Sequence, residues 1–227
     1  MGGATRGYTQ GMYWLLAGVS VAADFDQLLS PSGWTSVGEV QHELLGTVSI
    51  ALKTVEGERC LRGRAISPPS PEILYDVVTD IPAAKRFSRE KLLASEVLDT
   101  EGDTVHYYQH LDVPGWTLAA DRYWVLEGRS ASSGSARAFR WRRFDWRPRY
   151  PELAARIQRD HPNAVEPDPN WGSWVFEPTE GGTQMRYYIC SDPGGSIPGW
   201  VERTAATRSL PNTMADVARE AIRRTGP

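Results

Sequence analysis

Ser191-Asp192-Pro193-Gly194-Gly195-Ser196-Ile197-Pro198-Gly199-Trp200 marks the point where the last predicted strand of this 227-residue chain gives way to its last predicted helix. Residues 183–190, just before it, alternate and are rich in β-forming residues, which predicts a half-buried strand. Pro193 and the two glycines end that strand, because proline donates no ladder hydrogen bond and glycine tolerates unusual backbone angles. Ser196 as N-cap and Pro198 in the first turn predict the helix start.

The last predicted helix has one wide apolar face. Apolar residues recur at three- and four-residue spacing from Ile197 to Ile222, among charged residues. Pro211 lies inside this pattern and predicts a kink, because it removes the hydrogen bond to residue 207. A long, kinked helix requires a broad partner surface, which the preceding strands can supply. We therefore expect an α+β fold in which a curved antiparallel sheet wraps around the C-terminal helix.

The chain before this helix predicts one antiparallel meander with a few helices. Short turns separate strands at residues 40–45, 48–53, 59–66, 94–99, 104–111, 118–127, 136–144, 171–177 and 183–191. Ser70 and Pro71 predict the cap and first residue of a short helix that ends near Asp80. Further helices are predicted at 83–87 and 151–159, the latter in an insertion before Trp171.

The end of the chain also resembles a known family. Phe176-Glu177-Pro178 with Gly181-Gly182-Thr183, and then Asp-Pro-Gly-Gly-Ser-Ile-Pro-Gly-Trp at 192–200, looks like the end of a bacterial-type START domain. START domains are the lipid-binding branch of the Bet v 1-like (SRPBCC) helix-grip superfamily. The resemblance covers roughly residues 33–224. It implies a helix-grip fold and a START-like lipid-binding domain over 24–227.

This resemblance implies that the chain binds, and carries, a lipid or other hydrophobic small molecule between the sheet and the C-terminal helix. It also implies that the loop 112–117 gates the cavity opposite that helix. The expected ligand-binding residues are Tyr107, Trp116, Arg122, Trp124, Trp141, Trp174, Trp200, Val201 and Met214. We expect no catalytic residue, no cofactor and no bound metal.

Asp121-Arg122-Tyr123-Trp124 is similar to the Arg-Asp-aromatic run of START domains, with the two charges in swapped order. Strand alternation puts Arg122, Trp124 and Leu126 on one face and Asp121 and Tyr123 on the other. The apolar residues favour the first set inside. Arg122 would then need a carboxylate or a ligand head group as partner. The alternative is an ion pair at the outside of the strand.

The histidines and cysteines indicate no metal site by their spacing. His106, Tyr108 and His110 share one face of a strand, but the two histidines lie about 13 Å apart and cannot bind the same ion. No nucleophile elbow or phosphate-binding glycine loop is present. Cys60 and Cys190 lack metal spacing, and the sequence leaves open whether they form a disulfide.

Two other functions remain open at this stage. One is an enzyme of the polyketide cyclase type on the same fold, for which Tyr107, His106, His110 and Arg122 are the candidate acid-base groups. The other is a protein-interaction module without a cavity, in which bulky side chains such as Trp141 and Trp174 fill the interior.

The charge distribution indicates no nucleic-acid partner. The formal net charge is −3, and the alternating basic and aromatic residues of 138–147 fit a strand with Phe139 and Trp141 on one face and Arg140 and Arg142 on the other. Transient membrane contact is expected through the 112–117 loop and the C-terminal helix, which has a small excess of arginines.

The N-terminus has the layout of a secretory signal peptide in residues 1–23. Arg6 precedes an apolar run over 12–21, followed by small residues. The run is too short to span a bilayer. It predicts a periplasmic or secreted protein; an ordinary N-terminal helix, and hence a cytoplasmic protein, is the alternative.

Overall fold

The computed structural model describes residues 24–113, 119–192 and 199–226, with only the backbone for 199–208. In this part the strands form one antiparallel sheet in the order β1-β2-β3-β9-β8-β7-β6-β5-β4. The strands are β1 (Thr35–His42), β2 (Gly46–Val55), β3 (Glu58–Ser67), β4 (Leu92–Glu101), β5 (Thr104–Leu111), β6 (Arg122–Ser133), β7 (Ala136–Arg143), β8 (Asn170–Thr179) and β9 (Gly182–Ser191). The helices are residues 24–29, α2 (Pro71–Thr79), η1 (Ile81–Ala83), α3 (Ala84–Phe87), α4 (Pro151–Asp160) and α5 (Gly199–Thr225).

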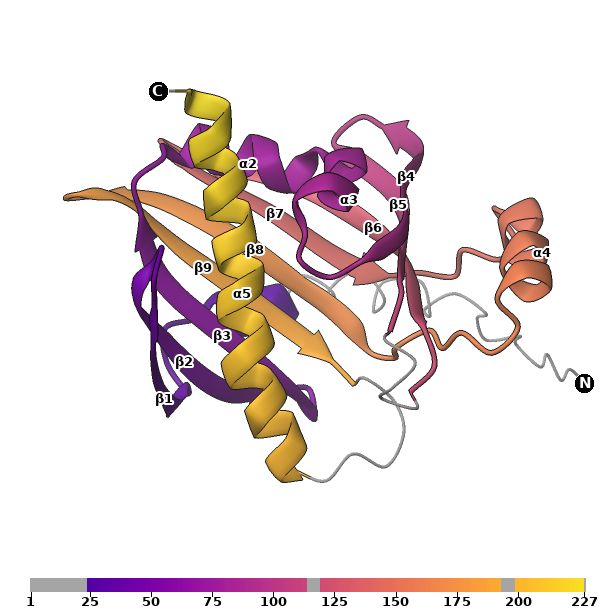
Figure 1. Cartoon of the computed structure of the whole chain (residues 1–227), viewed down its shortest axis with the longest axis horizontal. Coiled ribbons are helices and arrows are strands. Elements are labelled where there is room, and N and C mark those ends of the chain that lie inside the picture. The colour runs from indigo at the N-terminus through magenta and orange to yellow at the C-terminus, as the bar shows by residue number, and fades with distance from the viewer. Residues whose placement is uncertain (1–23, 114–118, 193–198, 227) are drawn as a thin grey trace, which may run out of the picture.

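The long helix α5 crosses one face of the curved sheet, with α2 and α3 beside it (Figure 1). This confirms the predicted α+β helix-grip fold. Leu210 and Met214 of α5 are buried in the main core. A Cβ at Gly63 of β3 would lie 2.2 Å from Leu210 Cδ2 and 2.5 Å from Met214 Sδ. The missing side chain therefore lets α5 pack directly against β3.

Most predicted elements are present, with some changed boundaries. β5 has the predicted bounds, and Ser70 Oγ accepts the Ile73 N–H at 3.5 Å as the cap of α2. The strand predicted over 118–127 instead begins at Arg122. It continues to Ser133, where the positive φ of Gly134 allows a tight turn. In α5, helical backbone continues on both sides of Pro211, while Ser196 and Pro198 lie outside the described residues.

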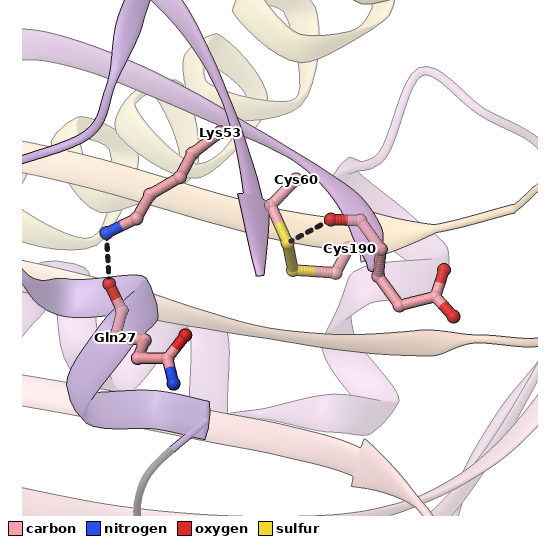
Figure 2. Close-up of a disulfide and its surroundings, with 5 residues drawn as sticks. Gln27, Lys53, Cys60 and Cys190 are labelled. Carbon is pink, nitrogen blue, oxygen red and sulfur yellow. Dashed lines mark hydrogen bonds between the residues drawn. A yellow bond between two sulfur atoms is a disulfide. The ribbon is translucent and has the colours of Figure 1, made fainter. Parts of the chain in front are cut away.

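Smaller clusters cover the face of the sheet opposite α5. The helix at residues 24–29 packs there over β3 and β9 through Phe25 and Leu28. Figure 2 shows the disulfide between Cys60 and Cys190 near this helix, and Lys53 Nζ donating to the carbonyl oxygen of Gln27. The structure thus pairs the two cysteines, a question that the sequence left open.

The helix α4 packs on the same face of the sheet as the helix at residues 24–29, but over β5 and β6 instead of β3 and β9. Leu153 and Ile157 of α4 pack with Tyr108 and Tyr123 on the outer side of β5 and β6. No helix in the described part of the chain is long and apolar enough to cross a membrane. The predicted signal peptide at 1–23 lies outside the described residues.

Glu220 on α5 provides a test of how this helix is held. Its carboxylate accepts hydrogen bonds from Arg223 and Arg224, and Arg224 also reaches Asp80 at the end of α2, at 2.8 Å. The hydrogen bond from Arg223, helped by Arg224, lowers the pKa of Glu220 from 4.5 to about 2 although burial opposes the shift. The charged form therefore stabilises the fold at neutral pH, and this contribution is lost as the pH falls from 4.5 towards 2.

We expect Glu220→Gln to lower the free energy of unfolding by about 1–2 kcal/mol at pH 7, because hydrogen bonds to a charged acceptor are lost. The difference from the wild type should shrink steadily below pH 4.5. Urea unfolding between pH 3 and 7 measures it, with the exposed Glu180→Gln as control. A difference that stays constant over this range would contradict the assignment.

Candidate functional site

A cavity of about 370 Å³ lies between α5 and the sheet. Strands β4 to β9 form its base, and α2, η1, α3 and α5 contribute to the rest of its wall. Most of its wall is apolar, and six aromatic side chains dominate the sheet side: Tyr107, Trp124, Phe139, Trp141, Trp174 and Tyr187. Pockets for small molecules have this composition and fall in the range of about 300–1,000 Å³.

Strand alternation decides which residues of β5 and β6 face the cavity. Tyr107 and Gln109 of β5 line it, whereas Tyr108 packs beside α4 on the opposite face. On β6, Arg122 and Trp124 line the cavity, as the apolar residues of that set predicted. The side-chain period of two in a strand therefore separates a ligand-sized cavity from a solid outer core.

Three aromatic rings form a continuous wall across β7, β8 and β9. Trp174 stacks on Tyr187 with ring centroids 4.2 Å apart, and Trp141 stacks on Tyr187 at 5.8 Å. Gly172 leaves room for Trp141, because a Cβ there would lie 2.5 Å from the indole. Trp141 and Trp174 thus line the cavity instead of filling it.

Arg140 and Arg142 of β7 lie on the other face, as alternation predicted. Arg142 donates to Glu127 at 3.1 Å, and Arg140 lies over the ring of Phe25, 5.5 Å from its centroid. These arginines interact with other side chains of the outer face and are separated from the cavity by the sheet.

A chain of hydrogen bonds orients Trp124 in the cavity wall. Its indole N–H donates to Gln109 Oε1 at 2.9 Å, and Gln109 Nε2 donates to Ser95 Oγ at 2.9 Å. The Ser95 hydroxyl donates to the carbonyl oxygen of Ile81 at 2.5 Å. This chain connects β6, β5 and β4 to η1, so it also positions the short helices that close one side of the cavity.

Two phenol groups in the wall have no hydrogen-bond partner among the described residues. Burial raises the pKa of Tyr107 well above its usual value, with a further contribution from Tyr187, and burial raises the pKa of Tyr187. Both phenols are therefore neutral at physiological pH. They can donate hydrogen bonds to a bound molecule but cannot serve as bases, which need a pKa near the working pH.

Arg122 reaches the cavity while the preceding aspartate faces away from it. Arg122 lines the cavity, and its Nη1 donates to the carbonyl oxygen of Ala120 at 2.5 Å. Asp121 Oδ2 lies 3.4 Å from His110 Nε2 on the opposite face. The swapped order of the two charges thus leaves the arginine on the cavity side.

The remaining predicted ligand-binding residues have different positions. Met214 is fully buried against β3 beside Gly63, and the cavity-lining residues of α5 are Thr213, Asp216 and Val217. Trp116 and the side chains of Trp200 and Val201 lie outside the described residues.

Sequence reasoning missed Tyr187 and Gln109. The alternation of 183–190 contained the signal for Tyr187, because Met185, Tyr187 and Ile189 share the face that packs towards α5. Gln109 follows in the same way from Tyr107, two residues earlier on the same strand.

Comparison with solved structures shows which fold this is. The human StAR-related lipid transfer protein 5 aligns over 93% of this chain and 98% of its own, with a TM-score of 0.73 and 16% identity. The chain has the START-type helix-grip fold. A STAR-related lipid transfer protein from Xanthomonas axonopodis aligns over 84% of this chain and 99% of its own (TM-score 0.65, 21% identity), and human STARD10 over 88% and 78% (TM-score 0.68, 17% identity). No protein-family model and no curated protein sequence matches the chain.

Two of the four candidate acid-base groups, His106 and His110, lie on the other face of the sheet and do not reach the cavity. His106 Nδ1 is hydrogen-bonded to the Tyr150 hydroxyl at 2.8 Å, and His110 Nδ1 to the Tyr108 hydroxyl at 2.9 Å. Both histidines lie on the face of β5 opposite to Tyr107. The hypothesis that they act on a molecule in the cavity is therefore wrong, because the sheet itself lies between.

We expect Tyr107→Phe and Tyr187→Phe to change the free energy of unfolding by less than about 0.5 kcal/mol, because no hydrogen bond within the described residues is lost. Tyr108→Phe is the matched comparison on the other face; it should cost about 1 kcal/mol, because it removes the partner of His110 Nδ1. Urea unfolding of the three variants measures this. A similar loss at Tyr107 and Tyr108 would show that the Tyr107 hydroxyl already has a partner.

Proposed function

We propose that this protein binds a lipid or another hydrophobic small molecule in the cavity between the sheet and α5, and carries it without chemical change. The observation that carries the proposal is the aromatic cavity of about 370 Å³. Burying apolar ligand surface there contributes about 25 cal/mol per Å² removed from water. Solved structures of the same fold include proteins named for lipid transfer, which supports the same conclusion.

Polar groups at the cavity wall would orient the ligand. The neutral phenols of Tyr107 and Tyr187 can each donate a hydrogen bond to the ligand. Arg122, at the start of β6, places a positive charge at the cavity wall. A ligand with one oxygen-bearing end and an apolar body fits this arrangement. The two phenols would select for a hydrogen-bond acceptor on the ligand. A ligand without one would leave the phenol hydroxyls unpaired in an apolar cavity, which is costly.

The two alternatives receive less support. For an enzyme of the cyclase type, only Tyr107 and Arg122 of the four candidates face the cavity, and the raised pKa of Tyr107 makes it a poor base. For an interaction module without a cavity, Trp141 and Trp174 would have to fill the space that they line.

A carrier must collect and release its ligand, so the proposal includes transient membrane contact through the 112–117 loop and the C-terminal helix. It also includes a periplasmic or secreted location. The disulfide between Cys60 and Cys190 supports that location, since such bonds persist mainly in oxidising compartments.

Native mass spectrometry of the purified protein, followed by organic extraction, tests the binding proposal directly. We expect a co-purifying hydrophobic molecule at about one per chain. Delipidated protein should bind the fluorescent probe 1-anilinonaphthalene-8-sulfonate, and Val217→Phe should weaken this binding at least about tenfold by occupying the cavity.

Ile222→Phe is the matched control on the same helix, because Ile222 is 37% exposed and lies outside the described cavity wall. It should bind the probe like the wild type. Equal probe binding by all three proteins, with no co-purifying molecule, would contradict a ligand-binding cavity.

For the location, we expect the chain expressed with its own N-terminus in a Gram-negative host to be recovered from the periplasm, starting near Ala23 or Asp24. Thiol titration in denaturant should find no free thiol in this material. Cytoplasmic protein that keeps residues 1–23 and two free thiols would contradict export.

A further inference from the structure

One nitrogen of a fully buried histidine makes no hydrogen bond with the described residues, although a carboxylate lies near it. The His110 side chain is 0% exposed, and its Nδ1 is hydrogen-bonded to the Tyr108 hydroxyl at 2.9 Å. Its Nε2 makes no hydrogen bond with any described residue. Polar atoms that are buried without a hydrogen bond are uncommon in folded proteins and destabilise them. The nitrogen is therefore available to a ligand that the described residues do not supply.

Two further metal-binding side chains surround this nitrogen. Asp121 Oδ2 lies 3.4 Å from His110 Nε2, and the His161 ring centroid lies 4.1 Å from that of His110. One ligand atom from each of the three residues lies within 4.8 Å of the other two. A tetrahedral zinc site with bonds of about 2.0–2.1 Å holds its ligand atoms about 3.3–3.4 Å apart. His110 and Asp121 already have this separation.

Neighbouring groups orient two of the three residues for this role. Metal-binding histidines are usually hydrogen-bonded through their second nitrogen, which fixes the ring and its tautomer. The Tyr108 hydroxyl does this for His110. Asp121 Oδ1 accepts the backbone N–H of Val113 at 3.0 Å, so the carboxylate presents its other oxygen to His110.

The third residue can adjust its position. His161 directly follows α4, where its N–H donates to the Ile157 carbonyl oxygen at 2.8 Å and its carbonyl oxygen accepts from Ala164. Its side chain is half-exposed. A rotation of this ring can therefore shorten the remaining distances, and solvent can supply a fourth ligand.

We propose that His110, Asp121 and His161 bind one Zn²⁺ ion, with water as the fourth ligand, on the sheet face opposite the cavity. Two imidazole nitrogens and a carboxylate oxygen are ligands that zinc accepts in open sites. The ion connects the end of β5, the residue before β6 and the end of α4. Since Asp121 directly precedes Arg122, the ion also fixes the backbone at the start of β6.

Titration of the metal-free, untagged protein with ZnCl₂ in a calorimeter tests this proposal. We expect one equivalent to bind and to raise the melting temperature. Asp121→Asn and His161→Gln should each weaken binding by about 100-fold or more, since even the loss of an outer partner of a metal ligand costs 10–100-fold. Both variants should fold: Asn keeps the acceptor for Val113 N–H, and His161 is half-exposed.

His42→Gln is the matched control, because His42 lies at the end of β1, at the opposite edge of the sheet. It should bind Zn²⁺ like the wild type. Co²⁺ in place of Zn²⁺ should give the visible absorption bands of a tetrahedral site in the wild type and in His42→Gln. Equal affinities for the wild type and the Asp121→Asn/His161→Gln double variant would overturn the proposal, as would loss of binding in His42→Gln.

Discussion

The cavity depends on how α5 is held against the sheet. Direct packing occurs at β3, where Gly63 allows Leu210 and Met214 to approach the strand. Polar contacts hold the same helix to the short helices and the segment after them: Arg224 binds Asp80, and Asp216 accepts the backbone N–H of Arg89 at 2.7 Å. Because these contacts lie around the cavity, α5 can stay fixed while space remains over β5 to β8.

The sheet separates two environments by the orientation of successive side chains. On the α5 face, large aromatic rings surround open volume, and Trp174 and Tyr187 stabilise one another by stacking. On the outer face, Tyr108 and Tyr123 pack closely with α4. A ligand and a metal ion could thus be bound a few residues apart in sequence without sharing any side chain.

Asp121 and Arg122 connect these two environments. They are adjacent, yet the aspartate contacts His110 on the outer face and the arginine reaches the cavity. Anything that fixes Asp121 therefore also fixes the backbone that positions Arg122.

Local patterns by themselves determined much of this protein: most of the strands, though not the bounds of β1 (predicted at 40–45, found at Thr35–His42), the cap of α2 by Ser70, the long terminal helix, and the cavity-facing positions of Trp124 and Trp141. These follow from hydrogen bonding and side-chain periods over a few residues, which a sequence displays directly. The tertiary structure alone decided the Cys60–Cys190 pairing, the burial of Met214 away from the cavity, and the approach of His161 to His110 and Asp121. Each of these depends on which distant segments become neighbours, and side-chain packing across the whole sheet, not local spacing, sets those distances.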